Sequence, residues 1–256
     1  MGISSSGSSL AGAGYYLHAG MLFDVARTTY VSLPTGSSDR DYGSDGALVC
    51  IVFATACLEA FINELSAIAL YLHDPNVGWG MYQTSHGAQP LIHMTPGMGR
   101  TIDPLVVFEM GEALDRAEND HKGPRVKYEI ALSMLSGGRT IKGEQPYQDL
   151  ALLISVRDQI VHTKTQEYDV HDDRLRSEQS AKLLRRLEDK GVTAVMDSPH
   201  VTTSLLGWVA TRAAARWACN TAAVAVNTII DRLPQGDSKQ VLKAAFGERF
   251  PRVDDG

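Results

Sequence analysis

The chain has only three cysteines among its 256 residues, and their spacing fits neither a disulfide framework nor a zinc site. Cys50 and Cys57 lie seven residues apart in an apolar segment, which favours buried thiols, and Cys219 lies far from both in the sequence. This scarcity suits a reducing compartment and indicates a cytoplasmic protein. The N-terminus also lacks the basic region and long apolar run of a signal peptide, so we do not expect one.

Long uninterrupted apolar runs and an excess of positive charge are missing too. Glu59 interrupts the apolar run that begins at Ala47, and two arginines interrupt the apolar stretch 205–230, so no membrane span is predicted. The net charge of -6 argues against a broad basic surface for nucleic acid. A small, local nucleic-acid site remains compatible with this charge.

Alternation of apolar and polar residues with a period of two is nowhere long enough to predict a strand, and there are no internal repeats. A helical period dominates, and a hydrophobic content of 44% can fill one large core. We therefore predict an all-α protein: a single helical bundle over 10–250, a flexible lead over 1–9 and an irregular insertion over 74–101. Helices are expected over 10–33, 46–73, 103–119, 124–136, 147–164, 176–190, 197–233 and 237–246.

The segment that points to chemistry is Arg157-Asp158-Gln159-Ile160-Val161-His162, near the end of the predicted helix 147–164. On a helical wheel Arg157 falls between two apolar stripes, on a face expected to be buried. Asp158 and His162 are four residues apart, so their side chains can meet and the carboxylate can orient the imidazole.

A purely structural interpretation of this segment stays open. Arginine and histidine near the end of a helix are favoured by its dipole, without any catalytic role. The same spacing occurs a second time, from Arg116 to His121, in a polar helix end with no apolar frame. We interpret this second occurrence as incidental.

A family resemblance supports the functional interpretation. The run PYQDLALLISVRDQIVH, residues 146–162, resembles the signature helix of the HEPN superfamily, whose motif is an arginine, a polar residue, a few more residues and a histidine. The run ATACLEAFINELS, residues 54–66, resembles the N-terminal helix of many HEPN-like proteins. The alanine-rich stretch 211–230 is in keeping with the same bundle, so the resemblance covers about half of the chain.

The resemblance implies a fold, an assembly and an activity. HEPN proteins are helical bundles that usually form homodimers, with two motif helices side by side. Many are metal-independent ribonucleases that serve as toxins or in antiphage defence, and others have lost catalysis and act as binding modules. Arg157, Asp158 and His162 match the motif positions. Relatives controlled by a nucleotidyltransferase antitoxin carry a tyrosine two residues after the histidine, and this chain has Lys164 there, so we do not expect that mode of control.

The residue types fit ribonuclease chemistry without a metal or a cofactor. RNA carries its own nucleophile, the 2′-hydroxyl. His162 can act as general acid or base near neutral pH, and Arg157 can stabilise the charge that grows on the phosphate. HEPN relatives often place a polar group beside the motif helix, so Glu59 and Asn63 are candidate site-lining residues. They are equally interpretable as a solvated pair.

Three functional hypotheses follow. The first is an endoribonuclease of HEPN type that cuts RNA as a homodimer, with an antitoxin or other regulatory partner possible. The second is a non-catalytic HEPN-like module that binds a nucleotide, RNA or a protein. The third is a helical interaction protein in which the motif is accidental. A locally basic stretch over 174–190 either steers an RNA backbone or forms a solvated helix face.

Overall fold

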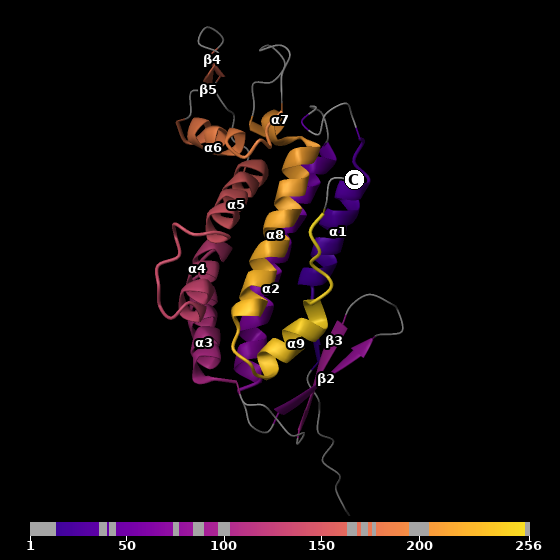
Figure 1. Cartoon of the computed structure of the whole chain (residues 1–256), viewed down its shortest axis with the longest axis vertical. Coiled ribbons are helices and arrows are strands. Elements are labelled where there is room, and N and C mark those ends of the chain that lie inside the picture. Colours follow the sequence, from indigo (N-terminus) through magenta and orange to yellow (C-terminus); the bar gives the residue numbers. More distant parts are fainter. Residues whose placement is uncertain are drawn as a thin grey trace, which may run out of the picture.

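The computed structural model describes residues 14–35, 40, 45–73, 77–83, 90–96, 103–162, 168–169, 174–175, 178–194 and 205–253. The lead predicted over 1–9 lies outside these residues. Helices make up most of the described chain, as predicted, and form an elongated bundle (Figure 1). They are α1 (Ala19–Val31), α2 (Asp45–Tyr71), α3 (Leu105–Asn119), α4 (Pro124–Leu135), α5 (Tyr147–Val161), α6 (Glu178–Glu188), α7 (Leu205–Val209), α8 (Arg212–Arg232) and α9 (Asp237–Phe246).

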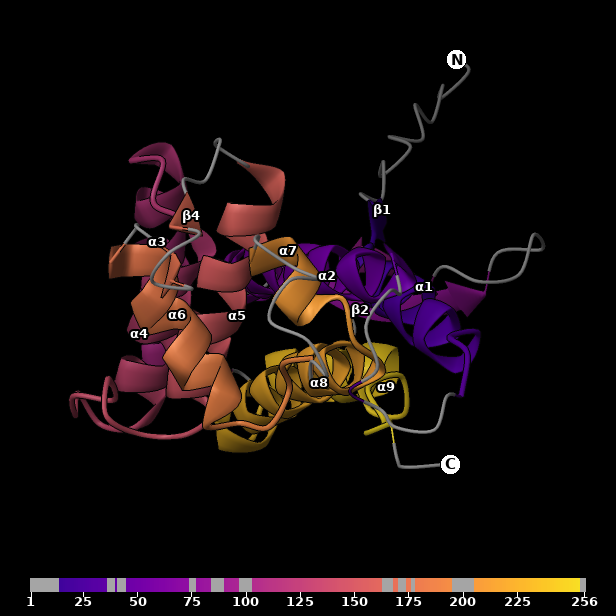
Figure 2. The same ribbon diagram turned by 90° about the horizontal axis from the view of Figure 1, so that it is seen from above.

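Helix α2 forms the centre of the bundle. It packs against α1, α3, α5 and α8, and Figure 2 shows it between α1 on one side and α3, α4 and α5 on the other. By length and composition alone α2 is apolar enough to cross a membrane. In the bundle thirteen of its residues are buried, so it packs as a core helix against its neighbours.

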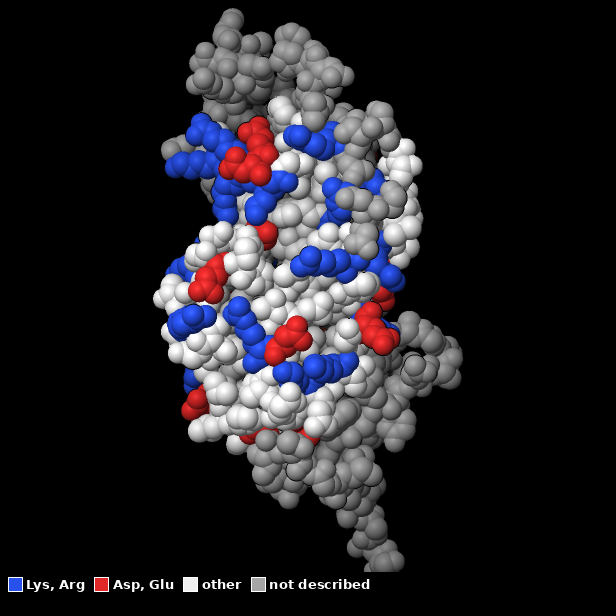
Figure 3. Space-filling model, viewed as in Figure 1, with Lys and Arg blue, Asp and Glu red and all other residues white. Residues whose placement is uncertain are grey.

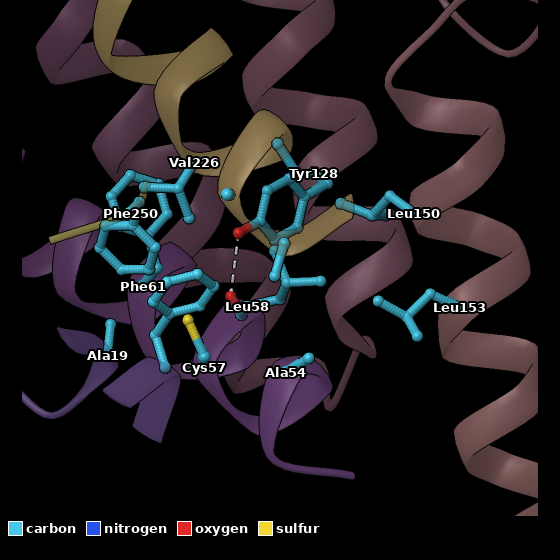
Figure 4. Packing of buried hydrophobic residues seen from close by; sticks show 14 of the residues in the cluster. Ala19, Ala54, Cys57, Leu58, Phe61, Tyr128, Leu150, Leu153, Val226 and Phe250 are labelled. Carbon is cyan, nitrogen blue, oxygen red and sulfur yellow. Dashed lines mark hydrogen bonds between the residues drawn. The ribbon is translucent and has the colours of Figure 1, made fainter. Parts of the chain in front are cut away.

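The core is built from the apolar stripes of these helices. In Figure 4 side chains from α2, α4, α5 and α8 converge, among them Leu58, Phe61 and Leu153. The fully buried Tyr128 of α4 donates its hydroxyl to the carbonyl of Leu58 at 3.1 Å. This bond gives a buried hydroxyl its hydrogen-bond partner, and it helps to set the position of α4 along α2.

Helix α3 approaches α2 closely at a glycine. A Cβ atom on Gly111 would lie 3.1 Å from the Cβ of Ala69 and 3.2 Å from the Cγ of Leu70. The carbonyl of Gly111 accepts the hydroxyl of Ser66 at 3.0 Å. The small residue thus allows the two helices to approach closely enough for this bond.

The insertion predicted as irregular over 74–101 contains strands, which corrects that expectation. Strand β2 (Val77–Gln83) pairs with β3 (Pro90–Pro96) as an antiparallel hairpin, and β1 (Gly14–Tyr16) adds to the other edge of β3. In β2 the apolar residues Val77, Trp79 and Met81 alternate with glycines, which are depleted in strands, so the pattern is short and the strand signal is weak. Two short strands, β4 (Tyr168–Asp169) and β5 (Arg174–Leu175), pair with each other.

Two predicted helices differ from the observed ones. The first begins at Ala19, not at residue 10. The helix expected over 197–233 is divided into α7 and α8. Thr211 causes the second difference because its backbone is extended and its hydroxyl oxygen accepts the backbone N–H of Ala214 at 3.0 Å. This is the geometry of a helix N-cap, and it starts a new helix at Arg212.

Candidate functional site

Arg157 lies between two carboxylates at the contact of α5 with α2. Its Nη2 atom donates to Oε2 of Glu59 at 3.3 Å, and its Nη1 atom is 3.2 Å from Oδ1 of Asp158. The arginine side chain is 20% exposed, whereas the two carboxylates are close to half exposed. Partial burial and two partners hold the guanidinium in one orientation while leaving an edge of it accessible to solvent.

His162 follows the last turn of α5 and is exposed. Its backbone N–H donates to the carbonyl of Asp158 at 3.0 Å, so the backbone of the histidine is still held by the helix. Within the described ranges no hydrogen bond joins the Asp158 carboxylate to the His162 imidazole. The carboxylate instead contacts Arg157.

Asn63 joins a second group of polar side chains one turn further along α2. Its Oδ1 atom accepts Nζ of Lys127 at 2.8 Å, and Lys127 also forms an ion pair with Glu118 of α3. Lys127 is 2% exposed. Burial lowers the pKa of Lys127, and the charge of Glu59 acts in the opposite direction. Glu59 and Asn63 therefore both belong to a polar network that links α2 to its neighbouring helices.

Lys127 was missed by sequence reasoning, although a signal was present. In α4 the buried residues include Pro124, Tyr128 and Ala131, which form one face of the helix. Lys127 falls on this face, three residues after Pro124 and four before Ala131. A lysine within a buried stripe needs a partner of opposite charge or a hydrogen-bond acceptor, and that requirement points to a buried polar contact.

The second occurrence of the motif has a different environment. Arg116 and His121 are both exposed, and His121 has a left-handed backbone conformation with φ of 56° in the turn after α3. No ion pair or hydrogen bond of their side chains is found in the part of the chain that the structure describes. The two occurrences thus differ in burial and in partners.

No cluster of three or more histidine, cysteine, aspartate or glutamate side chains suited to a metal ion is found among the described residues. The charged and titratable groups described in this region are the Arg157 guanidinium, the carboxylates of Glu59 and Asp158, the Lys127 ammonium and the His162 imidazole.

Helix α6, which contacts α5, carries a basic face. Leu183 and Leu187 are buried, and the exposed side bears Lys182, Arg185 and Arg186. In Figure 3, which has the same view as Figure 1, basic and acidic side chains lie side by side in the region of α6, so the surface there has mixed charge. Lys190, just after α6, is 2.7 Å from Oδ1 of Asp149 and ties this segment to the first turn of α5.

Comparison with known proteins finds no match: no family model, no curated protein and no solved structure is similar to this chain.

Proposed function

We propose that this chain is a metal-independent endoribonuclease of HEPN type that acts in the cytoplasm as a toxin or defence effector. The observation that carries the proposal is the position of Arg157, which is held by Glu59 of another helix and is followed on the same helix end by the exposed His162. A fixed guanidinium can stabilise the charge on the phosphate, and a solvent-accessible imidazole can transfer a proton, and RNA cleavage through the 2′-hydroxyl uses both kinds of group.

Arg157 supplies the phosphate contact in this mechanism. A guanidinium has five N–H donors. Glu59 and Asp158 are contacted by two of its nitrogens, and the remaining donors are available to the non-bridging oxygens of a phosphate. Asp158 then acts as a positioning residue for Arg157, together with Glu59.

His162 supplies the proton transfer. The 2′-hydroxyl attacks the adjacent phosphorus, the bond to the 5′-oxygen of the next nucleotide breaks, and a 2′,3′-cyclic phosphate and a 5′-hydroxyl result. One imidazole removes the proton of the attacking hydroxyl or protonates the leaving oxygen. Two such groups serve both steps, and a homodimer that brings two copies of His162 to one cleft provides them.

The surface beside His162 supports the homodimer. Val161, the last residue of α5, is 51% exposed. Covering this side chain with a second protein surface would remove apolar area from water, which is favourable. A second copy of the chain that covers Val161 would place its own α5 beside this one.

Binding without cleavage is the second candidate function, and a specific observation favours it. The two carboxylates that hold Arg157 also compensate its charge, which weakens its attraction for a phosphate. A protein of this kind would bind RNA, a nucleotide or a protein partner and leave RNA intact.

The test is cleavage of total RNA by the purified protein in excess chelator. We expect cleavage by the wild-type protein and by Arg116→Ala and His121→Ala, which carry the matched residues of the second motif. We expect none by Arg157→Ala and His162→Ala with unchanged circular dichroism. Intact RNA in every sample, at a protein concentration where RNA binding is saturated, would favour the binding module. Equal cleavage by His162→Ala would refute the proposed site.

A further inference from the structure

A pocket of about 370 Å³ lies apart from the Arg157 network, between the start of α5, the middle of α8 and the C-terminal segment. Its walls include Pro146, Asp149, Trp217, Val224 and Arg252. Pockets of roughly 300–1,000 Å³ are typical of small-molecule sites. The volume therefore suits a ligand at the small end of that range.

Trp217 gives the pocket an aromatic wall. Its Nε1 atom is buried and has almost no solvent-accessible surface, so the part of the side chain that a ligand in the pocket can reach is the ring. An aromatic ring favours stacking with a second planar ring. A ligand with a planar ring would therefore suit this wall.

The remaining walls favour an anion. Helix α5 begins at this pocket, and its dipole places partial positive charge there; no side chain caps its N-terminus, and the N–H of Gln148 in its first turn donates to the carbonyl of Glu144 at 3.1 Å. Arg252 is exposed and adds a full positive charge. The carboxylate in the wall, Asp149, is 2.7 Å from the ammonium of Lys190, which compensates its charge.

The segment that carries Arg252 is fixed in place. The side chain of Asn220 donates to the carbonyl of Val253 at 3.1 Å and accepts the N–H of the same residue at 2.8 Å. Asn227 donates to the carbonyl of Phe250 at 3.0 Å. These bonds hold residues 250–253 along α8, so the backbone on both sides of Arg252 is held against the pocket.

We propose that this pocket binds a small anion that carries a planar ring, with the ring against Trp217 and the acidic group near Arg252 and the start of α5. The phosphate of a mononucleotide and the carboxylate of an aromatic acid share this chemistry. None of the lining residues belongs to the Arg157 network, so the pocket stands independently of the proposed ribonuclease activity.

The test is titration of the full chain with four probes: AMP, indole-3-acetate, adenosine and inorganic phosphate. Isothermal titration measures affinity, and the indole N–H signals of the three tryptophans in a ¹H–¹⁵N spectrum report the site. We expect AMP, indole-3-acetate or both to bind and to shift the Trp217 signal. Tighter binding of AMP would identify the ligand as a nucleotide, and tighter binding of indole-3-acetate would identify it as an aromatic carboxylic acid. Adenosine and phosphate, which each lack one half of the ligand, are expected to bind at least about tenfold more weakly.

Variants assign the binding to the pocket. Arg252→Gln and Trp217→Phe should each weaken binding of the anionic probes by about tenfold or more, with circular dichroism unchanged. Arg116→Gln, at an exposed position of α3, and Trp208→Phe, on α7, are the matched controls and should bind as the wild type does. Failure of both ring-bearing anions to saturate at about 10 mM would overturn the proposal. Adenosine binding as tightly as AMP, or unchanged binding by Arg252→Gln, would overturn it equally.

Discussion

We expect Glu64, on the central helix α2, to make the stability of the protein depend on pH near neutrality. Its Oε1 atom accepts the backbone N–H groups of His18 at 2.5 Å and Ala19 at 3.2 Å, at the start of α1. Its Oε2 atom is buried and has no hydrogen-bond partner among the described residues. Burial raises the pKa of Glu64 from 4.5 to about 7, although the two backbone bonds act to lower it.

The sign and the size of the effect follow from this pKa. An acid whose pKa is raised by folding binds its proton more tightly in the folded chain. The contribution of Glu64 to the free energy of unfolding is therefore fully present below pH 4.5, and it is lost as the pH rises through about 7. The difference between the two pKa values corresponds to about 3 kcal/mol, an upper value because the site can relax on ionisation.

The perturbation is Glu64→Gln, which keeps an oxygen that accepts from His18 and Ala19 but removes the titration. We expect the free energy of urea unfolding of the wild type to fall by about 1–3 kcal/mol between about pH 5 and pH 8, relative to the variant. Glu109→Gln, an exposed residue of α3, is the control and should follow the wild type. An identical pH dependence in Glu64→Gln and the wild type would refute the reasoning.

Four further substitutions test separate parts of the structure. Thr211→Ala removes the N-cap of α8 and should cost about 1 kcal/mol in urea unfolding; no change would mean that the cap does not set the helix start. Leu153→Ala should cost about 2–5 kcal/mol because the side chain is fully buried, and a smaller loss would place it outside the core. Lys127→Met removes a buried charge while keeping the volume, so stability should change by less than about 1.5 kcal/mol while RNA cleavage falls; unchanged cleavage would exclude the network from the site. Val161→Asp should give monomers in light scattering, and a dimer that persists would remove α5 from the interface.

The helices were predictable where local signals decide the structure. Pro124 at the first helical position and Pro234 with Gly236 before the last helix mark boundaries that the structure confirms at α4 and α9. The apolar period of α2 likewise predicted a long buried helix, and Asp45 in its first turn agrees with the expected start.

Other features depend on contacts between distant segments. The hairpin of β2 and β3 is stabilised by pairing with β1, which is far away in the sequence, so neither strand has a strong signal of its own. The sequence around Thr211 predicts a continuous helix. In the structure the Thr211 hydroxyl donates to the carbonyl of Val192, a contact that the local sequence does not indicate. Both features required the tertiary structure.

The spacing in the sequence singled out the residues of the candidate site but not their contacts. Spacing on one helix suggested that Asp158 orients His162, whereas the arrangement across helices gives Asp158 and Glu59 to Arg157. Asn63 was named as a site-lining candidate, but its partner Lys127 comes from α4, and no spacing along the chain relates the two.

The most direct test of the central claim is the chemistry of the cleaved ends. An RNA oligonucleotide that the protein cuts in chelator is compared with the same sequence carrying a single 2′-deoxy nucleotide at the cut site. We predict that the RNA yields a 2′,3′-cyclic phosphate and a 5′-hydroxyl by mass spectrometry, that the deoxy substrate is not cut at that position, and that His162→Ala produces neither end. A 5′-phosphate product, or equal cleavage of the deoxy substrate, would contradict it.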